Sequence, residues 1–225
     1  MKREKPGRPL IECRELPPFA EHSLGTVRRA FERAVPCPLG QAWLKKTEVG
    51  FAPAVVRTGW RDQSLLVFAE LRDADIFTRA KAHGERLWEL SDAFEIFLRP
   101  AGRRGYVEFQ VAPNNLRLQL RFADARAVAR ARKTGSLEDA RMGGDAFRSR
   151  TWLRPKAGRW FVFAEIPAAS VCGRPEPLPG SEWFFSFSRY DYTRGCEEPV
   201  ISSTSPHARP DFHRRHEWGV IRFQN

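Results

Sequence analysis

Nine short segments of this chain alternate apolar and polar side chains with a period of two, which is the spacing of a β-strand with one buried face. Residues that favour turns, such as Gly, Pro, Asp and Asn, separate the segments. Many short strands in one chain are typical of two sheets packed face to face. We therefore predict an all-β fold, a two-sheet antiparallel β-sandwich of jelly-roll-like type, with strands at 49–57, 64–71, 93–99, 105–112, 115–122, 147–154, 159–166, 182–190 and 217–223.

The alternation also predicts which face of each strand is buried. One face of segment 105–112 is apolar, and we expect it to lie in the core. The other face is expected to meet water, and it carries Tyr106, Glu108 and Gln110. In segment 115–122 the leucines are expected to point inward, and the side chains expected to point outward are Arg117, Gln119 and Arg121.

The chain is expected to form one domain. It has 225 residues, 42% of them hydrophobic and 12% aromatic, and it contains no internal repeat and no Gly/Ser linker. Residues 1–42 are rich in proline, so we expect an irregular strap, with a short helix within 24–35, packed on a sandwich of residues 43–225. Residues 123–145 are rich in Ala and Arg and lack a wide apolar stripe, which predicts a short exposed helix and a mobile loop inserted in the sandwich.

No segment has the pattern of a secretory signal or a membrane span. The charged start lacks the apolar stretch of a signal, and no later run is long enough to cross a bilayer. We therefore expect a cytoplasmic protein without a membrane partner; its oligomeric state is left open. The cysteines lie far apart and form no CxxC pair, so we expect free thiols at Cys13, Cys37, Cys172 and Cys196.

The net charge of +11 is concentrated in one segment. Residues 99–159 contain 15 Lys and Arg against 5 Asp and Glu. No helix-turn-helix, zinc-finger or RNA-recognition motif accompanies this segment, so we interpret it as a solvated basic face. The alternative is a binding module for an anionic polymer or nucleic acid.

Motifs for catalysis are missing, since the sequence contains no GxSxG, GxxxxGK[ST], HExxH or GxGxxG. Glu95 and Glu108 fall on neighbouring predicted strands and are the carboxylate pair that a glycosidase could use. His207, His213 and His216 lie close together, but in a loop rather than on one helical face, which favours hydrogen bonding over metal binding. We expect a non-catalytic protein, with a glycoside-active enzyme as the less favoured alternative.

Two aromatic residues occupy polar loops, where a ring is hard to bury. Trp88 precedes the strand that carries Glu95, and Phe212 with His213 precedes the last strand. Flat rings stack on the apolar faces of sugars, and neighbouring polar groups bind the hydroxyls. The pattern therefore indicates a carbohydrate ligand.

Six ordered blocks of the sequence resemble the family 9 carbohydrate-binding modules and their DOMON-like relatives. The blocks are SLLVFAELRDADI, LWELSDAFEIFLRP, GYVEFQVAPNN, GRWFVFAEIPAASV, WFFSFSRYD and DFHRRHEWGVIRF. The resemblance covers roughly residues 43–225. It implies a β-sandwich in which two aromatic residues clamp a terminal sugar ring.

Residue by residue, the resemblance places Trp88 at the first clamping position and Phe212 at the second, where well-characterised binders carry Trp. Glu95 takes the position of a sugar-binding Glu, and Gln110 that of a polar residue that is commonly Arg. His213, beside Phe212, completes the predicted site. Because Phe has a smaller ring than Trp, weaker or altered specificity is expected.

The family also raises the question of cofactors. We expect none, although some members hold structural calcium, and Asp73, Asp75 and Asp92 could contribute ligands here. DOMON relatives bind haem, but Met142 is the one internal Met that could serve in a Met/His pair. A haem site is therefore not expected.

Overall fold

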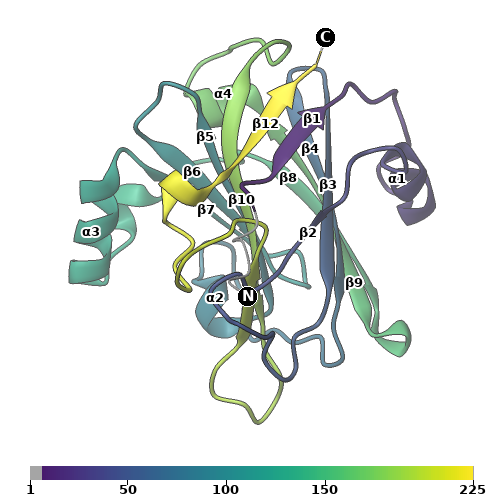
Figure 1. The fold of residues 1–225 in the computed structure, drawn as a ribbon, viewed down its shortest axis with the longest axis vertical. Coiled ribbons are helices and arrows are strands. Elements are labelled where there is room, and N and C mark those ends of the chain that lie inside the picture. The colour runs from purple at the N-terminus through teal and green to yellow at the C-terminus, as the bar shows by residue number, and fades with distance from the viewer. Residues whose placement is uncertain (1–6, 225) are drawn as a thin grey trace.

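The computed structural model describes residues 7–224, which form a sandwich of two sheets (Figure 1). Sheet A contains, in spatial order, β1 (Leu10–Cys13), β12 (Gly219–Phe223), β10 (Glu182–Asp191), β5 (Ala93–Pro100), β6 (Tyr106–Val111) and β7 (Arg117–Phe122), and β11 (Val200–Ser203) also pairs with β10. Sheet B contains β2 (Cys37–Pro38), β3 (Ala54–Arg61), β4 (Ser64–Arg72), β9 (Arg159–Pro167) and β8 (Arg148–Arg154). All neighbours are antiparallel except β1 and β12, so the predicted antiparallel sandwich is confirmed.

Each of the nine predicted strands is present. The first is displaced along the chain, since β3 begins at Ala54 rather than at residue 49. The alternation did not reveal β1, β2 and β11, which have four, two and four residues and are too short to show a period.

Four α-helices join the strands. They are α1 (Leu24–Ala30), α2 (Leu87–Leu90), α3 (Ala125–Thr134) and α4 (Ala168–Cys172), and three 3-10 turns occur at Glu138–Ala140, Pro155–Ala157 and Arg215–Glu217. The predicted helix within 123–145 is α3; the Asp124 side chain accepts a hydrogen bond from Ala127 N at its start, and Gly135 ends it with φ 66°. None of the helices in residues 7–224 is long and apolar enough to cross a membrane.

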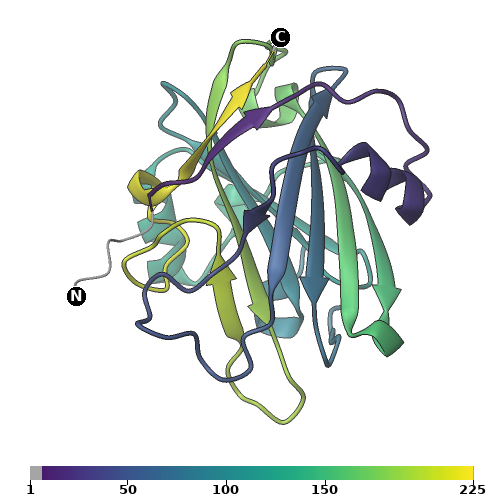
Figure 2. The ribbon, with the colours of Figure 1, turned by 45° about the vertical axis from the view of Figure 1, so that its right-hand side comes forward.

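The segment before residue 43 contributes to both layers (Figure 2). Its strand β1 pairs with β12 in sheet A, and β2 pairs with β3 in sheet B. Helix α1, within the predicted range 24–35, buries Val27 and Phe31 against the outer face of sheet B, where Phe31 lies 5.6 Å from Phe68 between ring centroids. Thus this segment covers one outer face and extends both sheets.

The outer face of sheet A is buried too, which corrects the prediction for 105–112. Strand β6 is buried on both faces, including Tyr106, Glu108 and Gln110. Helix α3 and the segment 204–218 lie over this face and form a second hydrophobic cluster with it. The polar face of an alternating strand is exposed to water only when no other element packs on it. The alternation of a strand does not reveal whether a distant segment packs on that face.

The prediction for 115–122 needs the same correction. Leu118 and Leu120 are buried, but they belong to the cluster below α3 and not to the core between the sheets. The alternate side chains close the edge of the sandwich: Arg117 donates to Phe147 O at 2.5 Å and Arg121 to Val171 O at 3.1 Å.

All four cysteines are unpaired, as predicted. Burial raises the pKa of the Cys13 and Cys37 thiols to about 12. These thiols stay protonated and therefore unreactive near neutral pH.

Candidate functional site

A pocket of about 580 Å³ opens on the outer face of sheet A. Strands β5, β6 and β7 form its floor, α3 one wall, and α2 and the 209–213 loop the others. Its volume is typical of sites for small ligands. Four of the five predicted site residues line it, namely Trp88, Glu95, Phe212 and His213.

The fifth, Gln110, joins two carboxyl groups on the floor. Strand register places Glu95 opposite Gln110, and Glu108 lies two residues from Gln110 on the same face. The Gln110 side-chain amide donates to Glu95 Oε1 at 2.8 Å and to Glu108 Oε1 at 2.6 Å. The expectation that Glu95 and Glu108 lie on adjacent strands is therefore confirmed.

Two acceptor atoms of this group are buried and unpartnered among the described residues. Glu108 Oε2 and Gln110 Oε1 have no hydrogen bond, although Glu108 is only 3% exposed and Gln110 is fully buried. Leaving a buried polar atom unpaired costs about 1–3 kcal/mol. Because Glu108 lines the pocket, a ligand hydroxyl could donate a hydrogen bond to Glu108 Oε2.

Burial shifts the carboxyl groups of the floor toward their uncharged forms. Burial raises the pKa of Glu108 to about 7, and burial together with the neighbouring Glu108 carboxylate raises the pKa of Glu95 well above its ordinary range. The protonated form that these shifts favour at Glu95 can donate as well as accept a hydrogen bond.

These shifts predict a fall in stability with increasing pH. Glu108 holds its proton in the folded chain up to about pH 7 but releases it near its ordinary value when unfolded. The stabilisation is fully present below pH 4.5 and is lost toward pH 7, by at most about 1.4 kcal/mol per pH unit. The free energy of unfolding by urea should fall less between pH 5 and pH 8 for Glu108→Gln than for the native chain. Equal losses would contradict the assigned protonation.

His213 is held beside the pocket by Tyr106. Its Nδ1 lies 2.5 Å from Tyr106 Oη, and its Nε2 lies 3.9 Å from Glu108 Oε2. Burial lowers the pKa of His213 to about 4, so the ring is neutral at pH 7. The side chain is 25% exposed and remains accessible to a ligand.

Two of the three histidines near the C-terminus approach the same carboxylate. His207 Nδ1 lies 3.1 Å from Glu217 Oε2, and the exposed His216 lies 3.5 Å from Glu217 Oε1. Within residues 7–224 they form no metal-ligand cluster. The hydrogen-bonding role expected for His207 and His213 is confirmed.

The two predicted clamping rings differ in exposure. Trp88, on α2, is half-buried and lines the pocket. The prediction that Phe212 offers a free ring is wrong: Phe212 is 4% exposed and packs in the second hydrophobic cluster. Trp43, from a segment outside the predicted site, lies 6.3 Å from Phe212 between ring centroids, and Tyr190 lies 5.7 Å away. These neighbours bury a ring that the loop sequence alone suggested was exposed.

The sequence did not predict the pocket residues that come from β10 and α3. Tyr190 lies in β10, and Val128 and Arg132 project from α3. The single buried Val128 amid Ala and Arg was too weak a signal to show that α3 has a packed face.

A second acidic group lies where β5 begins, because its member Asp92 directly precedes that strand. The carboxylates of Asp73, Asp92 and Asp191 come within 4.8 Å of one another, and the buried Arg189 guanidinium contacts Asp73 at 3.0 Å and Asp191 at 2.9 Å. Asp75, the third residue of the calcium prediction, instead accepts from Arg194 N at 2.7 Å.

The three carboxyl groups outnumber the one guanidinium. Burial and the neighbouring Asp73 raise the pKa of Asp92 to about 8, and burial raises the pKa of Asp191 to about 7. Oxygen ligands of this kind suit calcium, but both Asp92 oxygens already accept backbone N–H groups, from Phe77 at 2.5 Å and Tyr192 at 2.7 Å. Protons and Arg189 can balance the charge without a metal.

Comparison with known proteins shows the fold. No family model matches the sequence, and no curated protein matches it. A solved protein from Bacteroides uniformis, to which carbohydrate binding has been ascribed, superposes with a TM-score of 0.77 at 17% identity, over 97% of this chain and 100% of that one.

Two solved structures of a family 9 carbohydrate-binding module from Caldicellulosiruptor kristjanssonii also superpose. The complex with cellotriose has a TM-score of 0.64 at 16% identity, over 96% of this chain and 94% of that one. The complex with glucose has a TM-score of 0.63 at 16% identity, over 97% and 96%. The chain therefore has a family 9-like β-sandwich fold.

Proposed function

We propose that this chain binds carbohydrate in the pocket on sheet A and performs no chemistry on it. The observation that carries the proposal is the buried Glu95–Gln110–Glu108 group, with its unpartnered acceptors, beside the half-exposed ring of Trp88. A sugar has both features that such a pocket requires, hydroxyl donors and apolar C–H faces. The glucose and cellotriose bound by structural neighbours support this ligand class.

The division of roles follows from exposure and protonation. Trp88 is the stacking platform, and Phe212 supports the pocket wall from behind instead of acting as a second jaw. Glu108 accepts a hydrogen bond from a sugar hydroxyl, and the raised pKa of Glu95 favours a form that can also donate one. His213, fixed through Tyr106, supplies Nε2 at the same side of the pocket as Glu108.

A glycosidase would need one carboxylate as acid and the other as base or nucleophile. In this pocket one amide group holds both, and the pKa of each is raised. Neither is an ionised nucleophile well below pH 7. We propose binding without hydrolysis on this basis.

Calorimetric titration with glucose, cellotriose and a panel of other oligosaccharides tests this function. We expect saturable binding to at least one member, and no release of aryl alcohol from matching aryl glycosides. Binding to none would reject the carbohydrate proposal. Turnover that disappears in Glu108→Gln would establish an enzyme instead.

We also propose that the chain needs no cofactor, because Arg189 and protons balance the Asp73, Asp92 and Asp191 group. Thermal unfolding should be unchanged, within about 1 °C, by millimolar calcium or by a chelator. A calcium-dependent rise in melting temperature that Asp92→Asn abolishes would show that the group is a calcium site.

A further inference from the structure

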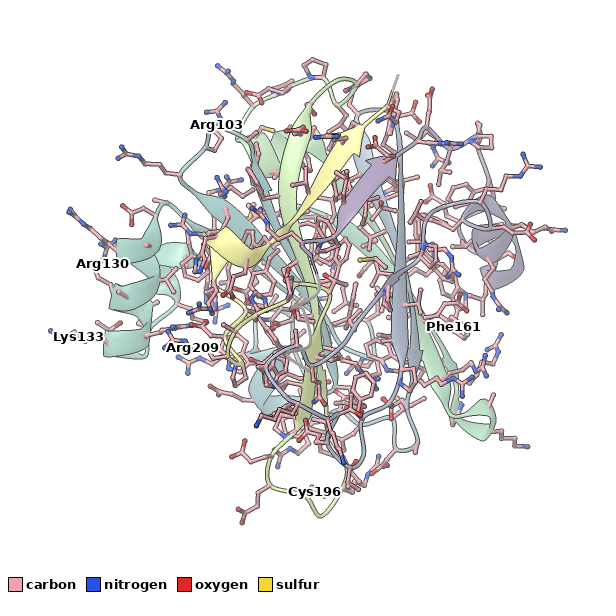
Figure 3. The ribbon with its side chains drawn as sticks, in the orientation of Figure 1. Arg103, Arg130, Lys133, Phe161, Cys196 and Arg209 are labelled. Atoms are coloured by element: carbon pink, nitrogen blue, oxygen red, sulfur yellow. The ribbon has the colours of Figure 1, made fainter. Side chains whose placement is uncertain are left out.

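The side of the molecule that holds the pocket is strongly basic. Figure 3 shows Arg130 and Lys133 on α3 and Arg209 on the adjacent loop at the side of the sandwich opposite Phe161. None of the ion pairs in the described chain includes Arg130 or Lys133, and Arg209 approaches Asp211 only at 3.5 Å. A ligand entering this pocket therefore meets a positive potential.

Next to the pocket, three arginines gather without an acidic partner. The arginine cluster consists of Arg8, Arg99 and Arg215; Arg99 and Arg8 lie over the Phe184 ring, at 4.2 and 5.5 Å from its centroid. The Arg215 guanidinium donates to the backbone carbonyl of Arg104. None of the three forms an ion pair within residues 7–224.

The guanidinium group of Arg99 has few groups near it that offset its positive charge. Its Nε is buried and has no hydrogen-bond partner among the described residues, while one Nη donates to Arg103 O at 3.0 Å. Burial and the charges of Arg215 and Arg8 lower its pKa. Like charges this close repel, so the cluster is unfavourable unless an anion or solvent offsets it.

The arginine cluster and the pocket lie over the same face of sheet A. Arg215 lies 5.8 Å from the centroid of Tyr106, whose hydroxyl contacts His213 in the pocket. On β6, Tyr106 is two residues from Glu108 and points to the same face, a spacing of about 7 Å along a strand. A ligand a few sugar units long could occupy both.

We propose that the natural ligand is an anionic glycan, whose neutral ring occupies the pocket at Trp88 and whose acidic substituent lies on the arginine cluster. This inference rests on the proposed carbohydrate function and specifies its ligand class. Guanidinium groups bind carboxylate and sulfate in the same bidentate manner, so both substituents fit.

Three probes of similar length separate these ligands: cellotriose, trigalacturonic acid and a heparin-derived tetrasaccharide. We expect at least one anionic probe to bind more tightly than cellotriose. Arg99→Gln and Arg215→Gln should each lower the anionic-to-neutral affinity ratio about tenfold, the effect of losing a charged hydrogen bond. Partial unfolding of a variant would lower its affinity for the anionic and the neutral probes alike and would leave the anionic-to-neutral affinity ratio unchanged. Arg150→Gln, an exposed arginine on sheet B, is the matched control and should change nothing.

The outcomes are distinct. Cellotriose bound as tightly as both anionic probes, with no effect of the arginine variants, overturns the inference and leaves the carbohydrate function standing. Binding of no probe removes both. Anionic binding that survives Trp88→Ala and is competed equally by duplex DNA also overturns the inference, and it favours a general polyanion surface.

Discussion

Replacing Trp88 by alanine is expected to weaken glycan binding by about 5- to 150-fold, which corresponds to the loss of about 1–3 kcal/mol of ring contact. Trp88 is half-buried, packs against the second hydrophobic cluster and lines the pocket beside Glu95, so part of its ring can contact a ligand there. Calorimetric titration with the same glycan measures the change. Circular dichroism and thermal unfolding of the variant show whether its fold is retained.

A matched control comes from the far sheet. Trp152, on β8, is also half-buried and, like Trp88, packs against a hydrophobic cluster, but its cluster lies on the outer face of sheet B. Trp152→Ala removes the same side chain away from the pocket and should leave affinity within about twofold. If the two variants bind equally, Trp88 is not a stacking platform.

Phe212→Ala is expected to lower the free energy of unfolding by about 3–5 kcal/mol, the usual cost of deleting a buried aromatic ring. The ring is buried among Trp43, Phe97 and Tyr190, with centroid distances of 5.7–6.4 Å. Urea unfolding measures this loss, provided that the native protein and the variant have the same dependence of unfolding free energy on urea concentration.

Phe212→Leu separates packing from binding. Leucine retains much of the buried volume but cannot stack on a sugar, so affinity should fall by no more than about threefold if Phe212 only supports the wall. Stability unchanged in Phe212→Ala, together with lost binding in Phe212→Leu, would restore Phe212 as a second clamping ring.

The strands were predictable because their apolar faces meet the core between the sheets. Val107, Phe109 and Val111 are all buried there, as their alternation indicated. The opposite face of β6 was not predictable in the same way, because its cover comes from α3 and from segment 204–218, far away in the sequence. Tyr106, Glu108 and Gln110 therefore lie in a polar floor below a second hydrophobic layer.

The site residues, too, were predictable where the strand pattern fixes them and unpredictable where distant segments do. Of the residues that the family pattern grouped, Glu95 and Gln110 face each other through the register of β5 and β6, and Trp88 lines the pocket together with Glu95. The family pattern misjudged Phe212, whose burial depends on Trp43, a residue outside every block of the pattern. Asp191 was missed for a similar reason, because the approach of β10 to Asp73 is a tertiary contact.

The role of the basic segment also depends on tertiary structure. A count of charges over 99–159 does not distinguish β8, on the far sheet, from α3, which borders the pocket. In the folded chain Arg99 meets Arg8 and Arg215 from opposite ends of the sequence. The arginine cluster thus results from the fold and not from a motif.

The most direct test of carbohydrate binding at this pocket is a nuclear magnetic resonance titration that follows the indole N–H signals of the seven tryptophans. Trp88 is assigned by the signal that disappears in Trp88→Phe, and Trp152 by the same method. On addition of cellotriose, trigalacturonic acid or the heparin-derived tetrasaccharide, the account predicts a saturable shift of the Trp88 signal and an unchanged Trp152 signal. Saturable binding that leaves the Trp88 signal in place would contradict it.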